Sequence, residues 1–164
     1  MSKNKNREDS PLIIKNSYFS ENENNLKQYI KYASLGRICF INCSFENMFS
    51  PGVIGSCSFE NCKFINFNAT KCLFSNCKFK NCQIINCQMR RLQLTKSSFT
   101  NCEFVKVDLA ASDFFRCKFE ETNFIEGDLS KIFASNVQIW KSNNLIEVEN
   151  NQDFKELLID TNCT

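Results

Sequence analysis

From Cys57 to Lys141, apolar and polar residues recur with a period of five. Counting the third residue of each five as its centre, the 17 centres from Phe59 to Ile139 are nine Phe, three Leu, two Ile, two Ala and one Met. The first residue of each five is never charged, and it holds all eight Cys of this stretch. The 20 charged residues between Cys57 and Lys141 occupy the other three positions. The first residue and the centre are therefore predicted to face a core.

Neither a helix nor a long straight strand can use a period of five. Five residues turn a helix through about 500°, which spreads the apolar stripe around the cylinder. A straight strand sends successive centres to opposite faces. A short strand from the first residue to the centre, followed by a corner, places both side chains inside. The corner residue is often Asn, which tolerates tight-turn backbone angles, at Asn61, Asn66, Asn76, Asn81, Asn86, Asn101 and Asn136. Regular corners predict a coil.

This pattern resembles that of the pentapeptide-repeat family: a small residue, often Ala or Cys, then Asp or Asn, then Leu or Phe, then two variable residues. The second position departs from it, because Lys, Ser or Gln is frequent there. The resemblance implies an all-β, right-handed quadrilateral parallel β-helix, a solenoid with four repeats per coil and short terminal helices. Residues 20 apart would then stack. Like residues do recur at that spacing, as in the series Phe59, Phe79, Phe99, Phe119 and Ile139.

Four segments are expected along the chain. Residues 1–10 are predicted to form a disordered arm, and residues 11–37 an N-terminal strand and cap with a helical excursion around Leu26, Tyr29 and Ile30. Residues 38–141 form the β-helix. Residues 142–164 form a capping or dimerisation segment, with a helix at 151–160 that starts near Asn151 and Asp153.

The first coil of the β-helix is predicted to be distorted. Phe49 and Ile54 are interpreted as centres in the main register, whereas Phe40 and Phe45 lie one residue out of phase. A residue is therefore expected to be missing between Phe45 and Phe49, near the turn at Pro51 and Gly52.

Composition argues against catalysis and against bound metal. The chain has 164 residues, a formal charge of +2, no His and 11 Cys, so His-based catalytic triads are excluded. Cys72, Cys77, Cys82 and Cys87 lack the close spacing of zinc sites and would lie on four different faces. No cofactor is expected. With a polar N-terminus and no apolar run of about 18 residues, we expect a soluble cytoplasmic protein that has no membrane partner and keeps its thiols free and buried.

The outward positions carry two candidate partner surfaces. Ile65, Ile85, Val105 and Ile125 form an apolar stripe at 20-residue spacing, which is covered either by the chain's own termini or by a partner. Near the C-terminal end, Phe115 also points outward by phase. A candidate dimer or cap surface at that end comprises Phe133, Trp140, Phe154, Leu157 and Leu158. Relatives in the family dimerise through this end, so the resemblance implies a homodimer.

Charge does not indicate a nucleic-acid partner. Between Cys57 and Thr100 there are seven Lys or Arg residues against Glu60 alone, but these cations are interpreted as spread over all four faces. A solvated surface explains them better than a phosphate-binding site. The segment from Asn101 to Lys141 is slightly acidic.

These observations favour a rigid, non-catalytic module that binds an unidentified protein partner. The alternative comes only from the resemblance. The quinolone-resistance pentapeptide proteins are dimeric β-helices that bind DNA gyrase and imitate DNA. An imitation of duplex phosphate requires an acidic face, whereas the formal charge of this chain is +2.

Inserting one residue after Asn81 should abolish folding, because every later side chain would exchange inward and outward positions. Inserting five residues there preserves the phase and should be less damaging, although it rotates the later coil by one face. Thermal melts of the two variants measure the difference. Equal stability of the two would contradict a coil with a period of five.

Overall fold

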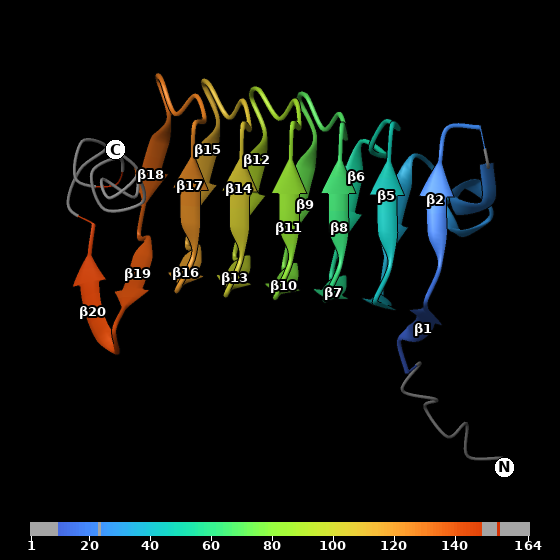
Figure 1. The fold of residues 1–164 in the computed structure, drawn as a ribbon, viewed down its shortest axis with the longest axis horizontal. Helices are drawn as coiled ribbons and strands as arrows, with labels where there is room; N and C mark the ends of the chain where they lie inside the picture. Colours follow the sequence, from blue (N-terminus) through green and yellow to red (C-terminus); the bar gives the residue numbers. More distant parts are fainter. Residues whose placement is uncertain (1–9, 23, 149–153, 155–164) are drawn as a thin grey trace, which may run out of the picture.

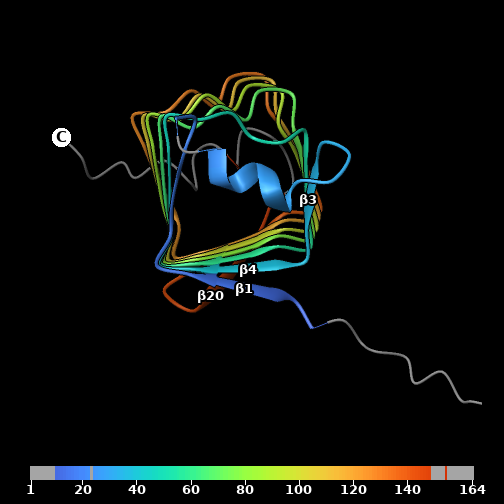
Figure 2. The same cartoon turned by 90° about the vertical axis from the view of Figure 1, so that its right-hand side faces the viewer.

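The chain winds into a right-handed coil with four sides in the computed structural model, which describes residues 10–22, 24–148 and 154 (Figures 1 and 2). Three sides are sheets of short strands that pair in parallel from one coil to the next. The fourth side has only single bridges, which link Phe49, Asn68, Gln88, Asp108 and Asp128 in order. This architecture confirms the predicted all-β solenoid.

Each sheet takes one strand from each coil. Sheet A contains β1 (Leu12–Lys15), β4 (Ile38–Ile41), β7 (Ser58–Glu60), β10 (Lys78–Lys80), β13 (Ser98–Thr100), β16 (Lys118–Glu120), β19 (Gln138–Lys141) and β20 (Asn144–Glu147). Sheet B contains β2 (Tyr18–Ser20), β5 (Ser44–Glu46), β8 (Lys63–Ile65), β11 (Gln83–Ile85), β14 (Glu103–Val105) and β17 (Asn123–Ile125). Sheet C contains β3 (Ser34–Gly36), β6 (Val53–Gly55), β9 (Leu73–Ser75), β12 (Gln93–Thr95), β15 (Asp113–Phe115) and β18 (Phe133–Ser135).

The corners between sides are left-handed turns. Every fifth residue from Asn61 to Asn136 has a φ between 46° and 60°. Asn adopts this conformation at low cost, and it occupies seven of these corners as the sequence predicts. Lys, Arg, Glu and Ala occupy the others, where the stacking of neighbouring coils holds them in this conformation.

The inner side chains form ladders of aromatic rings. On sheet A, Phe59, Phe79 and Phe99 are stacked with ring centroids 4.8 and 4.6 Å apart and ring planes within 12° of parallel. Phe64 of sheet B meets Phe59 edge-on at 5.3 Å. Offset-stacked and edge-to-face pairs are the favourable arrangements of aromatic rings. The interior is therefore filled by side chains and contributes its stability through burial and ring packing.

The first coil departs from the 20-residue repeat at a different place from the one expected. The pairs of β3 with β6, β4 with β7 and β5 with β8 are separated by 19 residues, as in Phe40 with Phe59, and so is the bridge between Phe49 and Asn68. The pairs of β1 and β2 with the next coil, such as Leu12 with Ile38, are separated by 26 residues. The missing residue therefore lies between Phe49 and Val53, at the turn through Pro51. The interpretation of Phe49 as an inward centre is wrong. Phe49 is 65% exposed, because it pairs with Asn68 and so takes the outward second position, next to the buried first position of Met48.

The N-terminal segment takes part in the coil. β1, β2 and β3, from residues 11–37, each join one of the three sheets, so the sheets begin before residue 38. The expected helical excursion is a 3₁₀ helix, η1 (Asn24–Tyr29), and Leu26 within it is buried. Viewed along the coil axis, η1 lies across the open N-terminal end (Figure 2). It therefore covers the first rung of the core. Residues 1–9 of the predicted arm lie outside the described residues.

The C-terminal end is closed by two elements. β20 pairs antiparallel with β19, placing Leu145 opposite Trp140. Phe154 is fully buried, with its ring centroid 5.1 Å from that of Phe114 and 5.6 Å from that of Phe119. The rest of the predicted 151–160 helix, including Leu157 and Leu158, lies outside the described residues.

Candidate interaction surface

The inward polar side chains form hydrogen bonds with backbone groups. The Cys77 thiol donates to the carbonyl oxygen of Ile54 at 3.4 Å, and the Cys117 thiol donates to that of Leu94 at 3.3 Å. Ser112 Oγ donates to the carbonyl oxygen of Met89 at 3.0 Å and accepts from an amide of the preceding coil, also at 3.0 Å. The first position therefore bridges backbone groups of the coil before it. Sequence reasoning treated these thiols only as small apolar groups. The signal that it missed was Ser97, Ser112 and Thr122 at the same position.

These thiols are not arranged for nucleophilic or metal chemistry. Burial raises the pKa of Cys77 to about 12 and the pKa of Cys87 and Cys117 to about 11. A thiol with such a pKa is protonated near neutral pH, and the thiolate is the nucleophilic form. Among the described residues, no three Cys, Asp or Glu side chains converge in a group that could hold a metal ion.

The outer surface of sheet B carries parallel columns of side chains. The first column is polar and contains Lys63, Gln83, Glu103 and Asn123. The second is the predicted apolar stripe, in which Ile65, Ile85, Val105 and Ile125 are adjacent in register. On the far side of the stripe, the Lys106 ammonium and the Glu126 carboxylate form an ion pair at 3.4 Å. The stripe is thus bounded by polar groups along both sides.

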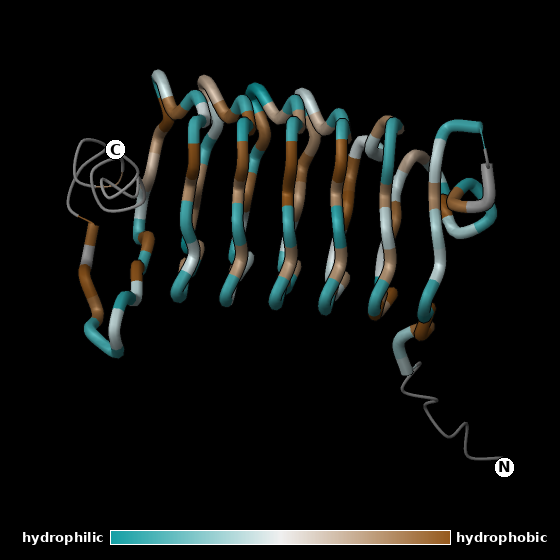
Figure 3. The backbone as a smooth tube through the Cα atoms, in the orientation of Figure 1, coloured by the Kyte–Doolittle hydropathy of each residue, from teal (hydrophilic) through white to brown (hydrophobic). Residues whose placement is uncertain are grey.

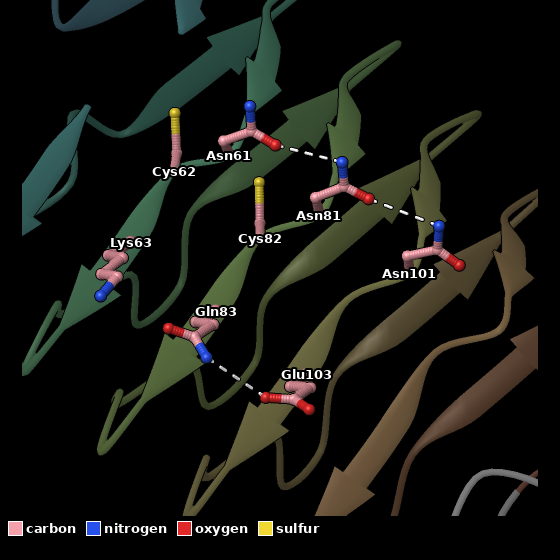
Figure 4. A pocket seen from close by; sticks show the side chains of 8 residues that line it. All are labelled: Asn61, Cys62, Lys63, Asn81, Cys82, Gln83, Asn101 and Glu103. Carbon is pink, nitrogen blue, oxygen red and sulfur yellow. Dashed lines mark hydrogen bonds between the residues drawn. The ribbon is translucent and has the colours of Figure 1, made fainter. Parts of the chain in front are cut away.

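A ladder of asparagine side chains runs along the corner between sheets A and B. Each amide donates to the side-chain oxygen of the Asn one coil earlier, with Asn81 to Asn61 at 3.1 Å and Asn101 to Asn81 at 3.4 Å (Figure 4). The ladder continues back through Asn42 to Asn16. Its last member is Asn101; at the next corner, the Glu121 carboxylate accepts a hydrogen bond from the Ser142 amide. These bonds lock the corner in place.

A shallow groove of about 340 Å³ lies between the asparagine ladder and the polar column of sheet B. Asn61, Asn81 and Asn101 form one side, and Lys63, Gln83 and Glu103 form the other (Figure 4). Gln83 Nε2 on β11 donates a hydrogen bond to Glu103 Oε2 on the adjacent strand β14 at 3.4 Å. The groove is polar and open, which is unlike the enclosed apolar cavities that bind small molecules.

The apolar stripe is half-buried, and no described segment crosses it. In Figure 3 the apolar part of β8, β11, β14 and β17 forms a band across the front of the molecule. β1, η1 and β20 lie at the ends of the coil (Figure 1). Glu46 is the partner of Ile65 on β5, so the stripe stops there. With rungs about 4.8 Å apart, four side chains span roughly 14 Å.

The predicted C-terminal surface is divided among three environments. Phe133 is 58% exposed on sheet C, where Phe115 of the neighbouring strand is 38% exposed. Trp140 is half-buried on sheet A, and the Lys118 ammonium lies 5.0 Å from its ring centroid. Trp140 Nε1 is buried and has no hydrogen-bond partner among the described residues. Phe154 is inside the coil. The structure therefore does not gather Phe133, Trp140 and Phe154 into one surface.

The repeat is decisive for the family. Residues 57–91 and 93–131 match the pentapeptide repeats, in eight copies. This chain is a pentapeptide-repeat protein. No curated protein sequence matches it. In the described part of this pentapeptide-repeat protein, no helix has the length and apolarity needed to cross a bilayer.

Solved structures of other pentapeptide-repeat proteins are similar at low identity. A trypsin-treated variant of QnrB1, a plasmid-mediated fluoroquinolone resistance protein, is 12% identical with a TM-score of 0.46, covering 77% of this chain and 72% of that one. Rfr23 from the cyanobacterium Cyanothece is 12% identical with a TM-score of 0.24, covering 80% and 86%. HetL from the cyanobacterium Nostoc is 6% identical with a TM-score of 0.25, covering 76% and 84%. Similarities at this level do not indicate function.

All 11 Cys should be found as free thiols. The ten described Cys are unbridged, and nine of them are buried with their thiols turned toward backbone carbonyls or packed in the core. Alkylation in denaturant without reductant, followed by intact mass measurement, should show 11 adducts, whereas the native protein should react slowly. Nine or fewer adducts in denaturant would show at least one disulfide and contradict the assignment.

Proposed function

We propose that this pentapeptide-repeat protein is a rigid, non-catalytic module that binds a protein partner through sheet B. The observation that carries this proposal is the apolar stripe of Ile65, Ile85, Val105 and Ile125. These side chains lie in register on one flat sheet, are half-buried by their neighbours alone, and are bordered by polar columns. Contiguous apolar surface rimmed by polar groups is typical of a partner site.

The inward side chains serve packing and backbone hydrogen bonding, which supports a non-catalytic role. Inward side chains fill the core, and the inward hydroxyls of Ser97, Ser112 and Thr122 bond to backbone groups. The chain contains no His. Specificity therefore depends on the outward side chains, which the coil holds at a fixed rung spacing of about 4.8 Å.

The gyrase-binding alternative receives no support from the distribution of charge. A surface that imitates duplex DNA requires carboxylates in continuous rows. Here Glu60, Asp108, Glu120 and Glu126 each pair with a cation at 3.1 to 3.4 Å. Acidic side chains on sheet B are interrupted by Lys63, Gln83 and the apolar stripe. We therefore favour a partner with an apolar contact element.

Ile85→Lys and Val105→Lys should each weaken partner binding at least tenfold, because a charge would be buried in the centre of the interface. Their melting temperatures should change little, since both side chains lie outside the core. A photo-crosslinking residue at position 65 identifies the partner, and titration of that partner then measures the affinities.

Thr100→Lys is the matched control, because Thr100 is also half-buried and outward but lies on sheet A. It should leave affinity unchanged. Strong destabilisation by both stripe variants would mean that the chain's own termini cover the stripe. Equal loss of affinity in the control would place the interface elsewhere.

We also propose a homodimer joined near the C-terminal end, where Leu145 remains exposed beside Trp140. Deleting residues 150–164 should convert the dimer to a monomer or an aggregate in sedimentation experiments. Phe154→Ala tests the capping role by itself. It should lower the free energy of unfolding by about 3–5 kcal/mol, because it empties the end of the core. An intact chain that sediments at 19.0 kDa at high micromolar concentration would contradict the dimer.

A further inference from the structure

The outer surface of sheet C is almost free of charge. Its strands present two outward columns, one containing Ser34, Val53, Leu73, Gln93, Asp113 and Phe133, the other Gly36, Gly55, Ser75, Thr95, Phe115 and Ser135. Asp113 is the single charged residue among these twelve. Sheet C lies behind sheet B in Figure 1, on the opposite side of the coil.

Cations line both corners that border this sheet. Arg37, Lys96 and Arg116 lie at the corner toward sheet A, and Lys71, Arg91 and Lys131 lie at the corner toward the fourth side. All six side chains are exposed. The ion pairs among the described residues use Lys80, Arg90, Lys106 and Lys118, and none of these six. The face therefore has an unneutralised basic rim, although the whole chain has a formal charge of only +2.

Exposed aromatic rings lie within this rim at its C-terminal end. Phe115 and Phe133 lie on neighbouring strands. Phe115 pairs with Ser135, so the two aromatic residues are offset by two residues along the strands. The Arg116 guanidinium lies 4.9 Å from the centroid of the Phe115 ring. Lys131 precedes Phe133 by two residues. Rings and cations thus share one flat patch.

We propose that this end of sheet C binds the surface of a bilayer that contains anionic lipids. Lys and Arg side chains at the rim reach phosphate and carboxylate headgroups, and each adds to the attraction. Phe115 and Phe133 enter the boundary between headgroups and acyl chains, as apolar side chains of peripheral membrane proteins do. A planar lipid surface can contact the cations and the aromatic rings at the same time, because it offers anionic headgroups and an apolar interior over one area.

The arrangement fits a nucleic acid less well. The two rows of cations lie on either side of the sheet, about 15 Å apart, which is the length of a five-residue extended segment. Single-stranded nucleic acid offers only one row of phosphates. One face of the Phe115 ring is occupied by Arg116, so it is not free to stack on a base. A duplex offers phosphates but no apolar region for Phe133.

This orientation leaves the apolar stripe pointing away from the lipid. Sheets B and C are on opposite sides of the coil, so the stripe and the basic aromatic patch do not compete for one partner (Figure 1). The proposal is independent of the protein-binding function, because it uses none of the residues of sheet B.

The test is co-sedimentation of the full chain with vesicles of phosphatidylcholine alone or with added phosphatidylserine. The protein should bind only the anionic vesicles, and salt should weaken binding. Arg91→Gln combined with Lys131→Gln should lower the partition coefficient roughly 25-fold, about fivefold per cation. Phe133→Ser should lower it about tenfold with an unchanged melting temperature.

Lys63→Gln combined with Lys78→Gln is the matched control, since both are exposed cations on sheets B and A. It should reduce the partition less than twofold. An equal loss in this control would overturn the site, because the attraction would then follow net charge. Absence of binding to anionic vesicles, or binding only to a single-stranded oligonucleotide, would overturn the lipid assignment. A change in sedimenting mass for Phe133→Ser without a change in partition would make the patch an interface between copies.

Discussion

The left-handed corner at every fifth residue is the constraint on which the rest of the structure depends. A non-glycine residue at positive φ costs about 1–2 kcal/mol when it lacks a local hydrogen-bonding side chain. Parallel pairing, stacked rings and the asparagine ladder offset this cost along the coil. Because the corners repeat without interruption from Asn61 to Asn136, the same two positions of each five are kept inside. The core, the flat sheets and the aligned outer columns all follow from that regularity.

This constraint separates the residues that hold the fold from those available for recognition. The inward Cys, Ser and Thr complete backbone hydrogen bonds, and the Phe ladders fill the interior. Outward side chains contact mainly their equivalents one coil away, so a substitution at Ile85 or Phe133 changes surface chemistry without altering the core. Two chemically different faces, one with an apolar stripe and one with a basic rim, can therefore share one narrow scaffold.

The repeat made most of the fold predictable from the sequence, because a period of five specifies both the inward positions and the corners. Asn corners, the Phe ladders and the alignment of Ile65 with Ile85 followed directly. Phe49 was misplaced because hydrophobicity does not reveal where a coil is shortened by one residue. β20 was missed because its residues lie beyond the last complete repeat. The basic rim of sheet C was also missed, because counting cations by chain segment hides the corner that each occupies.

The reversal of chain direction at β20 has a consequence for self-association. A parallel coil ends in strand edges that could template the first coil of another molecule, and such growth would produce a filament. On sheet A, the antiparallel pairing of Ile139 with Ile146 changes the hydrogen-bonding pattern presented at that edge. A second molecule could not continue the parallel ladder there in register. The hairpin thus acts as a terminator that keeps a highly repetitive sequence from polymerising end to end along this sheet.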